Sequence, residues 1–432
     1  MTCNNAIHES KSRKIGFRYT SVKKALDMLR SKVKLEPALE VVSLKNVFKR
    51  VLIDNLLAKA DIPPHNTSTL DGYAVRATDI SSASPNNPVI LKISGKGNLI
   101  KVPRNHLKSG QAFDILTGGY LPKGSDTILG VEEVELGRGV IHVDLKYPKN
   151  RGVYPRGEDV KGKAITFRKG HIIRAQDIGL LGMMGITKIP VVRKPRVVII
   201  PVGSELTDDI TGIEKGKTPA THQLVVSAMV EEAGGEAIVF PSTVDDTKIL
   251  SREINRALKI GDIILTIGGT SLGEADLVED VVNSLGNPGM VVHGVKLDPG
   301  RVAGFGVIKG KPIILLPGLI QSTINAFIVF GYTAMELAIG HVSGTFGFKV
   351  SATLTSGRDF RKKFFDFVKI TYVRLSFTGI EFEAEPILGE TAMISVLTKA
   401  NGYISSPEDK KKLEKGERVL VNLLPGFSFT SG

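Results

Sequence analysis

The pattern of hydrophobic and polar positions divides the chain into stretches of different character. Residues 21–33 carry apolar side chains at helical spacing behind a serine cap, which predicts an amphipathic helix. From about residue 60 to 150, short alternating runs such as 88–94 and 140–145 are separated by Gly, Pro and Asn turns, a pattern typical of a small β domain. Residues 157–192 mix short strands with one short helix, and we interpret them as a connecting layer.

Strands and helices alternate in the third stretch of the chain. Residues 196–202 (RVVIIPV) form a near-continuous apolar run, which suits a strand buried on both faces. After it we expect helices over 221–233, 246–258, 275–285 and 321–339, and strands over 236–240, 262–267, 291–297 and 312–316. This alternation predicts a mostly parallel, doubly wound α/β sheet. Beyond Gly340 the pattern returns to β strands, at 367–377, 380–386 and 417–424.

Length and composition narrow the class of protein. A chain of 432 residues is long enough for two to four domains. The single cysteine, Cys3, excludes a disulfide scaffold and a cysteine-built zinc site, and it suits a reducing cytosol. The first 20 residues hold no apolar core of signal-peptide length, and no later apolar run is long enough to span a bilayer. We therefore expect a cytoplasmic protein without a membrane partner.

Charge adds one further expectation. The sequence has 57 Lys and Arg against 44 Asp and Glu, a formal net charge of +13, which predicts anionic partners. Nucleic acid is one candidate, but Trp is absent, aromatic residues make up 6%, and the basic residues are dispersed. A small polyanion such as a phosphorylated metabolite fits at least as well, and a Lys-rich solvated surface is an equal alternative.

The most informative loop follows the expected strand at 262–267. Ligands of open α/β sheets bind at the carboxyl ends of the strands, and here the loop reads GGTSLGEAD from Gly268 to Asp276. Its glycines let the backbone approach a ligand, Thr270 and Ser271 add hydroxyl donors, and the next helix directs its N–H groups there. This combination suits a phosphate. Alternatively, the glycines only turn the chain and Ser271 or Asp276 caps the helix.

Other signals are weaker or exclude whole classes. Asp276 has the right chemistry for a hydrated Mg²⁺ beside a phosphate, although taken alone the residue is better explained as a solvated first-turn carboxylate. Asp71, which precedes Gly72, is typical of a turn. The loop lacks the Walker lysine and the GxGxxG pattern, so ATP hydrolysis and dinucleotide binding are disfavoured. The chain has no histidine and carboxylate pair of zinc-hydrolase type and no GxSxG elbow.

Several collinear stretches together resemble the molybdopterin molybdenumtransferase family, the group of MoeA and the gephyrin E domain. Collinear matches from about residue 21 to 425 are far more specific than any single motif. The matching stretches are 61–74 (DIPPHNTSTLDGYA), 116–126 (LTGGYLPKGSD) with Glu132, 156–159 (RGED), 198–206, 268–276, 299–300, 316–318 and 391–404.

The resemblance implies a multidomain α/β plus β architecture assembled into a homodimer, with the site between subunits. Its four parts are an elongated linking domain (16–60 and 150–193), an inserted β domain (61–149), a molybdopterin-binding-type α/β domain (194–345) and a C-terminal β barrel (346–432). The independent succession of β, α/β and β patterns agrees with this order.

The resemblance also implies a reaction, the Mg²⁺-dependent insertion of molybdate, or tungstate, into adenylylated molybdopterin with release of AMP. No nucleic-acid partner is implied. The residues that match catalytic positions are Asp71, Thr117, Glu132, Glu158 and Asp276, and those that match metal ligands are Asp276 and Glu205. The matching substrate-binding residues are Gly268, Gly269, Thr270, Ser271, Gly273, Lys296, Arg301, Gly318 and Ser322.

Four loops depart from the family pattern. The usual TGDEL reads VGSEL, so Ser204 replaces an acidic residue. The usual DSN reads ATH, with His222 in place of Asn. The usual KPGKP reads DPGRV, so Asp298 replaces a lysine, and the usual PGNPVS reads PGLIQS, with Leu319 in place of Asn. Reversing one charge at ~4 Å from an anion shifts the interaction by several kcal/mol at an effective dielectric constant near 20.

These departures leave two functional classes open. The first is the enzyme, with Lys296 and Arg301 as candidates to compensate for Asp298. The second is a non-catalytic paralogue that binds molybdopterin or the finished cofactor, or that serves as a partner scaffold. A third class, a basic nucleic-acid binder, would rest on residues 361–365 (RKKFF), which we interpret as a strand flanked by solvated charge.

Overall fold

A computed structural model describes residues 18–104, 106–209, 216–270, 277–340 and 348–424. The chain forms two compact units, one built from residues up to 39 together with 192–432, and the other from residues 40–191. Each unit is treated by itself below. The four finer boundaries expected from the sequence stay predictions. No helix in the described ranges is long and apolar enough to cross a membrane.

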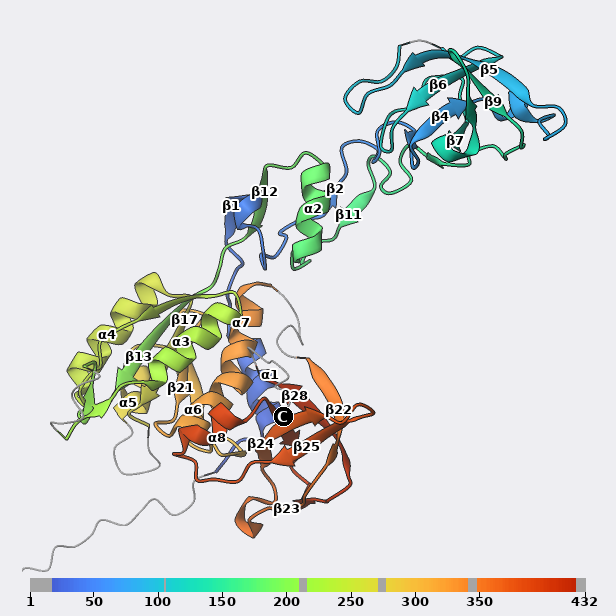
Figure 1. The fold of residues 1–432 in the computed structure, drawn as a ribbon. Helices are drawn as coiled ribbons and strands as arrows, with labels where there is room; N and C mark the ends of the chain where they lie inside the picture. The colour runs from blue at the N-terminus through green and yellow to red at the C-terminus, as the bar shows by residue number, and fades with distance from the viewer. Residues whose placement is uncertain (1–17, 105, 210–215, 271–276, 341–347, 425–432) are drawn as a thin grey trace, which may run out of the picture. The chain divides into compact units, whose positions relative to one another are not determined.

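The larger unit contains a six-stranded sheet in the order β16, β13, β17, β21, β20, β18, of which Figure 1 labels β13, β17 and β21. The first four strands are parallel to one another, and the last two run antiparallel to their neighbours. Their bounds are β13 Arg196–Val202, β16 Glu236–Val239, β17 Ile263–Gly268, β18 Pro288–His293, β20 Gly304–Ile308 and β21 Lys311–Leu316.

Helices cover both faces of this sheet. Val197 and Ile199 of β13 belong to one apolar cluster, whereas Val198 and Ile200 belong to another, because successive side chains of a strand point to opposite faces. The first cluster includes α1 (Val22–Lys32), α3 (His222–Glu232), α6 (Ile320–Ala326) and α7 (Tyr332–Ala338), and the second includes α4 (Thr247–Ile260) and α5 (Leu277–Ser284). The predicted doubly wound α/β domain is therefore confirmed.

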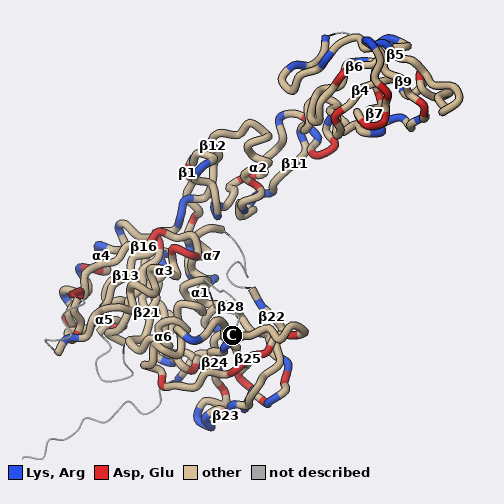
Figure 2. Tube along the Cα trace, viewed as in Figure 1, with Lys and Arg blue, Asp and Glu red and all other residues tan. Residues whose placement is uncertain are grey.

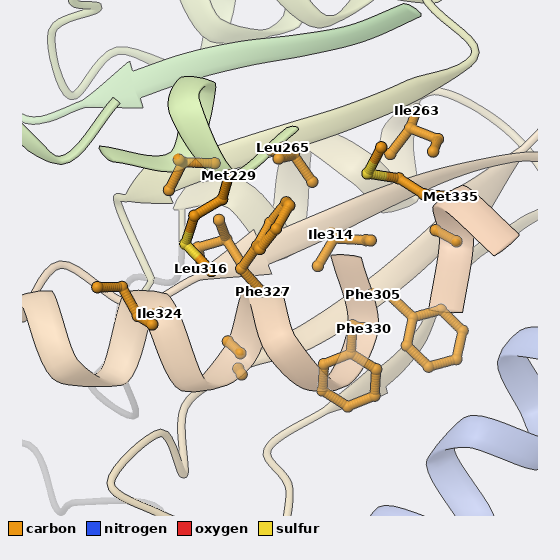
Figure 3. Packing of buried hydrophobic residues seen from close by; sticks show 14 of the residues in the cluster. Met229, Ile263, Leu265, Phe305, Ile314, Leu316, Ile324, Phe327, Phe330 and Met335 are labelled. Atoms are coloured by element: carbon orange, nitrogen blue, oxygen red, sulfur yellow. The ribbon is translucent and has the colours of Figure 1, made fainter. Parts of the chain in front are cut away.

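The centre of the first cluster is aromatic (Figure 3). Phe327 and Phe330 lie on a π-helical segment, Phe327–Gly331, that joins α6 to α7, so the predicted helix at 321–339 is one helical run with a π turn inside it. The Phe330 ring packs against Phe305 of β20 with 5.8 Å between ring centroids. A Cβ atom on Gly331 would lie 2.4 Å from the Phe327 ring, so this packing requires glycine.

Two details of the sheet differ from the sequence prediction. The strand expected at 291–297 begins earlier, as β18 (Pro288–His293), and the antiparallel strand β20 (Gly304–Ile308) was not predicted. Its sequence, GFGVI, carries two glycines, which disfavour a strand assignment. The structure gives the reason for both glycines. A Cβ atom would lie 2.2 Å from the Val292 carbonyl oxygen at Gly304, and 2.4 Å from a Val282 methyl group at Gly306.

The first helix, α1, confirms the expectation for residues 21–33. The Ser21 hydroxyl accepts a hydrogen bond from the Lys24 N–H at 3.3 Å, which caps the helix as predicted. Ala25 and Leu29 are completely buried in the cluster that contains Phe327. This N-terminal helix therefore packs in the core of the larger unit.

The last part of the larger unit is a closed five-stranded barrel, which confirms the predicted C-terminal β barrel. The strands run in the order β24, β25, β22, β28, β26, and a further pairing of β26 with β24 closes the ring. The short strand β19 (Leu297–Asp298) joins β24 in parallel, with Asp298 opposite Lys369. The bounds are β22 Lys349–Leu354, β24 Val368–Phe377, β25 Phe382–Pro386, β26 Gly402–Ser406 and β28 Arg418–Leu423.

The smaller unit, residues 40–191, has a six-stranded sheet in the order β7, β4, β6, β5, β9, β8. The strands are β4 Gly72–Val75, β5 Val89–Lys96, β6 Gln111–Ile115, β7 Thr127–Gly130, β8 Glu135–Leu136 and β9 Val140–Val143. Three two-stranded pairs and a helix complete it: β1 (Leu39–Ser43) with β12 (Lys188–Val192), β2 (Leu56–Leu57) with β11 (Ile165–Phe167), β3 (Thr67–Ser68) with β10 (Val153–Tyr154), and α2 (Ala175–Met183). The small β domain expected from the sequence is present.

The place of α1 in the core leads to a stability prediction. Leu29→Ala should lower the free energy of unfolding of the larger unit by about 2 to 5 kcal/mol, because it leaves a cavity beneath a fully buried side chain. Urea unfolding followed by circular dichroism measures this. Lys23→Ala, an exposed change on the same helix, is the matched control and should change the free energy by less than about 0.5 kcal/mol. Equal effects of the two changes would contradict the packing of α1.

Candidate functional site

Two loops meet where the central parallel strands of the α/β sheet end. Gly268 ends β17 opposite Val202 of β13, and Ile267 pairs with Leu316 of β21. A Cβ atom on Gly318 would lie 3.8 Å from the Cα atom of Gly268, so the loops after β17 and β21 are in contact. The structure thus brings together the predicted residues Gly268, Gly269, Thr270 and Gly318 at the carboxyl edge of the sheet. Ser271, Gly273 and Asp276 lie outside the described residues.

The two glycines that begin this loop are required by the backbone. Gly268 and Gly269 have φ angles of +85° and +65°, and a Cβ atom on Gly268 would lie 2.4 Å from the Val202 carbonyl oxygen. The steric interpretation of the glycines is therefore correct, although it does not exclude ligand binding. The Thr270 hydroxyl oxygen is buried and has no hydrogen-bond partner among the described residues. A buried polar group without a partner is costly, so a ligand atom beside Thr270 would satisfy it.

A carboxylate that the sequence analysis missed lies at the loop after β13. The Ser204 N–H donates to Asp245 Oδ2 at 2.9 Å, and the Asp245 N–H donates to the Ser204 hydroxyl at 3.1 Å. The Lys217 ammonium donates to the Ser204 carbonyl at 2.8 Å. Asp245 thus places an acidic group where Ser204 departs from the family motif. The sequence did offer a signal for Asp245, because two consecutive aspartates, Asp245 and Asp246, precede α4. Only one of them is needed as a cap, since Asp246 accepts the Ile249 N–H.

Glu205, predicted as a metal ligand, is exposed in the same loop. A Cβ atom on Gly203 would lie 2.6 Å from Glu205 Oε2, so the carboxylate turns back over that glycine. Within the described ranges no three His, Cys, Asp or Glu side chains are grouped to hold a metal ion. Because Asp276 lies outside those ranges, the paired prediction of Glu205 and Asp276 stays a prediction.

The two cations expected to compensate for Asp298, Lys296 and Arg301, contact different partners. The Lys296 ammonium donates to Asp366 Oδ2 at 2.7 Å, and this bond lowers the pKa of Asp366. Arg301 instead lies over the Phe364 ring, at 5.7 Å from its centroid, and interacts electrostatically with Asp298. Burial raises the pKa of Asp298, against the effect of the nearby cations Arg358, Arg361, Arg301 and Lys363. Arg301 is therefore placed to compensate, and Lys296 is engaged elsewhere.

A buried hydrogen-bond chain fixes this turn to the barrel. The Asn325 side-chain amide donates to the Pro299 carbonyl at 2.9 Å, and the Tyr372 hydroxyl donates to Asn325 Oδ1 at 2.6 Å. Burial raises the pKa of Tyr372, so its hydroxyl stays protonated and able to donate. Asn325 on α6 thus links the β19 turn to β24. Ser322 belongs to the same corner, since a Cβ atom on Gly300 would lie 3.7 Å from its carbonyl oxygen.

Two further substituted positions lie where the helices α6 and α3 begin. Leu319, at the start of α6, is 52% exposed, so an apolar side chain faces solvent where the family has asparagine. Gln321, two residues further along the chain, donates from its side-chain amide to the carbonyls of Glu390, at 2.8 Å, and Met393, at 3.2 Å. His222 begins α3, and burial lowers its pKa, so the imidazole is neutral at pH 7.

Three predicted residues of the smaller unit lie at one edge of its sheet. Asp71 precedes β4, whereas Thr117 and Glu132 follow the ends of the neighbouring antiparallel strands β6 and β7. Asp71 Oδ1 accepts a hydrogen bond from the Thr117 N–H at 2.6 Å, and this bond lowers the pKa of Asp71. Gly72 is required here because a Cβ atom would lie 1.8 Å from the Leu129 carbonyl oxygen. The three residues therefore form one group, with Asp71 ionised at neutral pH.

The support of Glu132 was not visible in the sequence. Glu132 belongs to a 3₁₀ turn, Val131–Glu133, whose last residue is paired with Arg151 at 2.7 Å between Nη1 and Oε2. Glu133 Oε2 also accepts the Gly130 N–H at 2.8 Å. These bonds hold the turn and leave the Glu132 side chain exposed.

Glu158 is not joined to this group. Glu158 is exposed in a turn, where its own N–H donates to the Pro155 carbonyl at 3.2 Å. The adjacent Arg156 donates to Asp61 Oδ2 at 2.6 Å. In the described part of the chain, no hydrogen bond or ion pair connects Glu158 to Asp71, Thr117 or Glu132.

Comparison with protein families assigns most of the chain. Residues 20–185 match the model of the MoeA N-terminal region, domains I and II. Residues 198–336 match a probable molybdopterin binding domain, and residues 357–424 match the MoeA C-terminal region, domain IV. The three matches follow the order expected from the sequence.

Individual relatives match over nearly their full length. A candidate molybdopterin biosynthesis protein of Methanocaldococcus jannaschii is 31% identical over 392 residues, which cover 89% of this chain and 92% of that protein. Molybdopterin molybdenumtransferase 2 of Mycobacterium tuberculosis is 28% identical over 385 residues, covering 86% and 91%. The crystal structure of a MoeA molybdopterin biosynthesis protein from Pyrococcus horikoshii superimposes with a TM-score of 0.81 at 29% identity, over 95% of this chain and all of that one.

The bond between Thr117 and Asp71 can be tested by titration. The pKa of the Asp71 carboxyl, measured by NMR, should lie below 3.8, because hydrogen bonds to the ionised form favour it. Thr117→Ala should raise this pKa only partly, since the backbone N–H, the larger cause, remains. The stability that this bond adds is present above the unfolded-state pKa and is lost as the pH falls through the folded-state value.

A matched control for this titration is Thr78→Ala, an exposed threonine change in the same β domain, which should leave the Asp71 pKa unchanged. An Asp71 pKa at or above 3.8 in the unaltered protein would reject the hydrogen-bonded geometry.

Proposed function

This chain belongs to the MoeA family of molybdopterin biosynthesis proteins, and from that premise we propose that it is a molybdopterin molybdenumtransferase. The reaction would be insertion of molybdate, or tungstate, into adenylylated molybdopterin with release of AMP. One observation carries the proposal. Gly268 and Gly269 meet the Gly318 loop at the carboxyl edge of the doubly wound sheet, beside the buried Thr270 hydroxyl. Such an edge is where open α/β sheets bind ligands.

The residues of the larger unit suit the binding of a phosphate-bearing substrate. Glycines without side chains let backbone N–H groups approach phosphate oxygens, and the Thr270 hydroxyl adds a donor. Arg301, Gly318 and Ser322 complete the proposed substrate-binding set around the β19 turn and the start of α6. In the smaller unit, the ionised Asp71 beside Thr117, together with the exposed carboxylates of Glu132 and Glu158, would act on the substrate as acceptors of protons or hydrogen bonds.

The carboxylates near Ser204 fit Mg²⁺. Glu205 and Asp245 offer oxygen atoms in one loop region, and Mg²⁺ in proteins is commonly held by one or two carboxylates together with substrate oxygens. We propose Asp276 and Glu205 as the ligands. When bound, the ion supplies positive charge beside phosphate oxygens. The contribution of Asp245 would be to keep acidic charge at the Ser204 loop.

A second candidate function is binding of molybdopterin or its cofactor without turnover. Asp298 favours this candidate, because it brings a negative charge to a turn where the family carries lysine and where the substrate would be anionic. This function needs the same glycine loop and differs from the first only in chemistry.

A turnover assay separates the two candidates. Purified protein supplied with adenylylated molybdopterin, molybdate and Mg²⁺ should release AMP, and Asp276→Asn should lower that rate at least tenfold, equivalent to about 1.4 kcal/mol of transition-state stabilisation. The amide keeps the shape and removes the charge. Asp144→Asn, an exposed carboxylate in the β domain, is the control and should retain the rate.

The opposite outcome has its own signature. If the unaltered protein binds the pterin and releases no AMP, while Ser204→Asp combined with Asp298→Lys recovers turnover, the chain is a binding paralogue. Full activity of Asp276→Asn would remove the proposed role of that carboxylate.

We also propose that the protein is a homodimer, as the family resemblance implies. Size-exclusion chromatography with light scattering at micromolar concentration should then give a mass of twice the 46.5 kDa of one chain. Dilution over a hundredfold range tests whether the assembly is stable, and a mass of one chain throughout would reject the dimer.

A further inference from the structure

The carboxylate of Asp298 faces an excess of positive charge. It interacts electrostatically with Arg301, Arg358, Arg361 and Lys363, so four cations act on one anion. Arg301 lies in the turn after β19, and Arg358 lies on β23 (Arg358–Asp359). Arg361 precedes and Lys363 belongs to a 3₁₀ turn, Lys362–Phe364, in the segment that the sequence suggested to be a strand. Figure 2 shows Lys and Arg gathered beside β23. The cluster therefore remains attractive to a further anion.

Asp298 and these four cations form no ion pair with one another in the described part of the chain. Among the described residues, no carboxylate oxygen lies within 4.0 Å of a nitrogen of these four cations, and Asp298 accepts no hydrogen bond there. Asp298 is only partly buried, so solvent or a small ligand can reach this residue.

The two sides of the cluster are held apart by the fold. Asp298 is fixed by the pairing of β19 with β24, where it lies opposite Lys369. Arg358 donates from Nη1 to the hydroxyl of Thr371, a fully buried residue two positions further along β24, at 3.1 Å. The same barrel strand therefore positions the carboxylate and the most buried of the guanidinium groups. A ligand that binds between them meets groups that are already in place.

Such a ligand must satisfy an acceptor as well as donors. Guanidinium and ammonium groups donate to bare oxyanion oxygens, whereas an ionised carboxylate can only accept. Hydrogen phosphate has both kinds of oxygen at neutral pH, because it retains one O–H group. Sulfate and molybdate have no proton at this pH, so one of their oxygens would face the Asp298 carboxylate and be repelled.

We propose that Asp298 makes this cluster selective for a phosphate group that carries a proton and disfavours fully deprotonated oxyanions such as sulfate and molybdate at neutral pH. The inference rests on the anion-binding role proposed for Arg301 and goes beyond it, because it concerns a phosphate with a free O–H group, whereas the bridging phosphates of adenylylated molybdopterin carry no proton at neutral pH. Asp298 then acts as a specificity-determining residue.

The pH dependence follows from the groups that face Asp298. The cations Arg301, Arg358, Arg361 and Lys363 face it, and the Lys369 ammonium donates to the carbonyls of Phe365, Glu408 and Lys410. Asp366 is paired with Lys296, which lowers its pKa, and Asp359 on β23 is exposed. Burial raises the pKa of Asp298, so its protonation on acidification would remove the repulsion. Sulfate should therefore bind more tightly as the pH falls.

Calorimetric titration of the full-length protein at low ionic strength tests the proposal. At pH 7.5, inorganic phosphate should bind at least tenfold more tightly than sulfate. Asp298→Asn should reduce this ratio to less than about threefold, mainly by tightening sulfate, because the amide can donate to it. Asp359→Asn removes the same charge from an exposed position of β23 and should keep the ratio.

Two further measurements locate and characterise the bound anion. Arg361→Gln, at an exposed position where folding is not at risk, should weaken phosphate and sulfate together and leave their ratio unchanged. Glycerol 3-phosphate, a monoester with a second pKa of about 6, should bind more weakly at pH 8 than at pH 6, because it loses its proton. Inorganic phosphate, which keeps one, should change less.

Three outcomes would overturn the proposal: no phosphate binding, phosphate binding that is insensitive to Arg361→Gln, or a phosphate-to-sulfate ratio that Asp298→Asn leaves unchanged. The proposed function fails separately. Selective phosphate binding without AMP release would reject the transferase function and support the selectivity proposed for Asp298. AMP release together with unchanged selectivity in Asp298→Asn would support the transferase function and reject the proposed selectivity.

Discussion

Parallel pairing of β13, β17 and β21, buried on both faces, is the constraint on which the larger unit depends. Strands that run in one direction end at one edge, so the loops after Val202, Gly268 and Leu316 converge whatever their sequences. The strands themselves carry almost no chemistry, because both faces are filled by apolar clusters. Apart from the buried Thr266 of β17, the polar groups near this edge therefore lie in the loops. The glycines at the end of β17 are needed for the backbone to leave the sheet beside the Val202 carbonyl.

The smaller unit reaches a similar result with antiparallel strands. Asp71 at the start of β4 meets Thr117 and Glu132 because β6 and β7 end on either side of it. Here too a glycine makes the approach possible, since Gly72 packs directly against the Leu129 carbonyl. In both units, a residue that looks like a plain turn glycine is the condition for placing polar groups from separate strands together. The steric and functional interpretations of these glycines therefore do not compete.

Periodicity in the sequence predicted the elements whose burial is regular, such as β13, α4 and the barrel strand β24. It missed β20 because glycine, required there by close backbone approach, is the residue that disfavours a strand. Contacts between distant residues were also beyond prediction. Lys296 was expected to compensate for Asp298, but it pairs with Asp366, 70 residues away, and the carboxylate beside Ser204 comes from Asp245, 41 residues away. Family resemblance supplied the order of the motifs, and only the fold could supply these partners.

The two charge-changing departures from the family motif consequently differ in kind. Loss of an acidic side chain at Ser204 is offset in space, because the serine hydroxyl and N–H bind the backbone and carboxylate of Asp245 and keep negative charge at the loop. Gain of an acidic side chain at Asp298 is not offset by contact, because the surrounding cations stop short of it. A missing group can be replaced by a neighbour, whereas an added charge changes how tightly any charged ligand binds beside it. Asp298, more than Ser204, is thus the substitution that changes which anion this turn can accept.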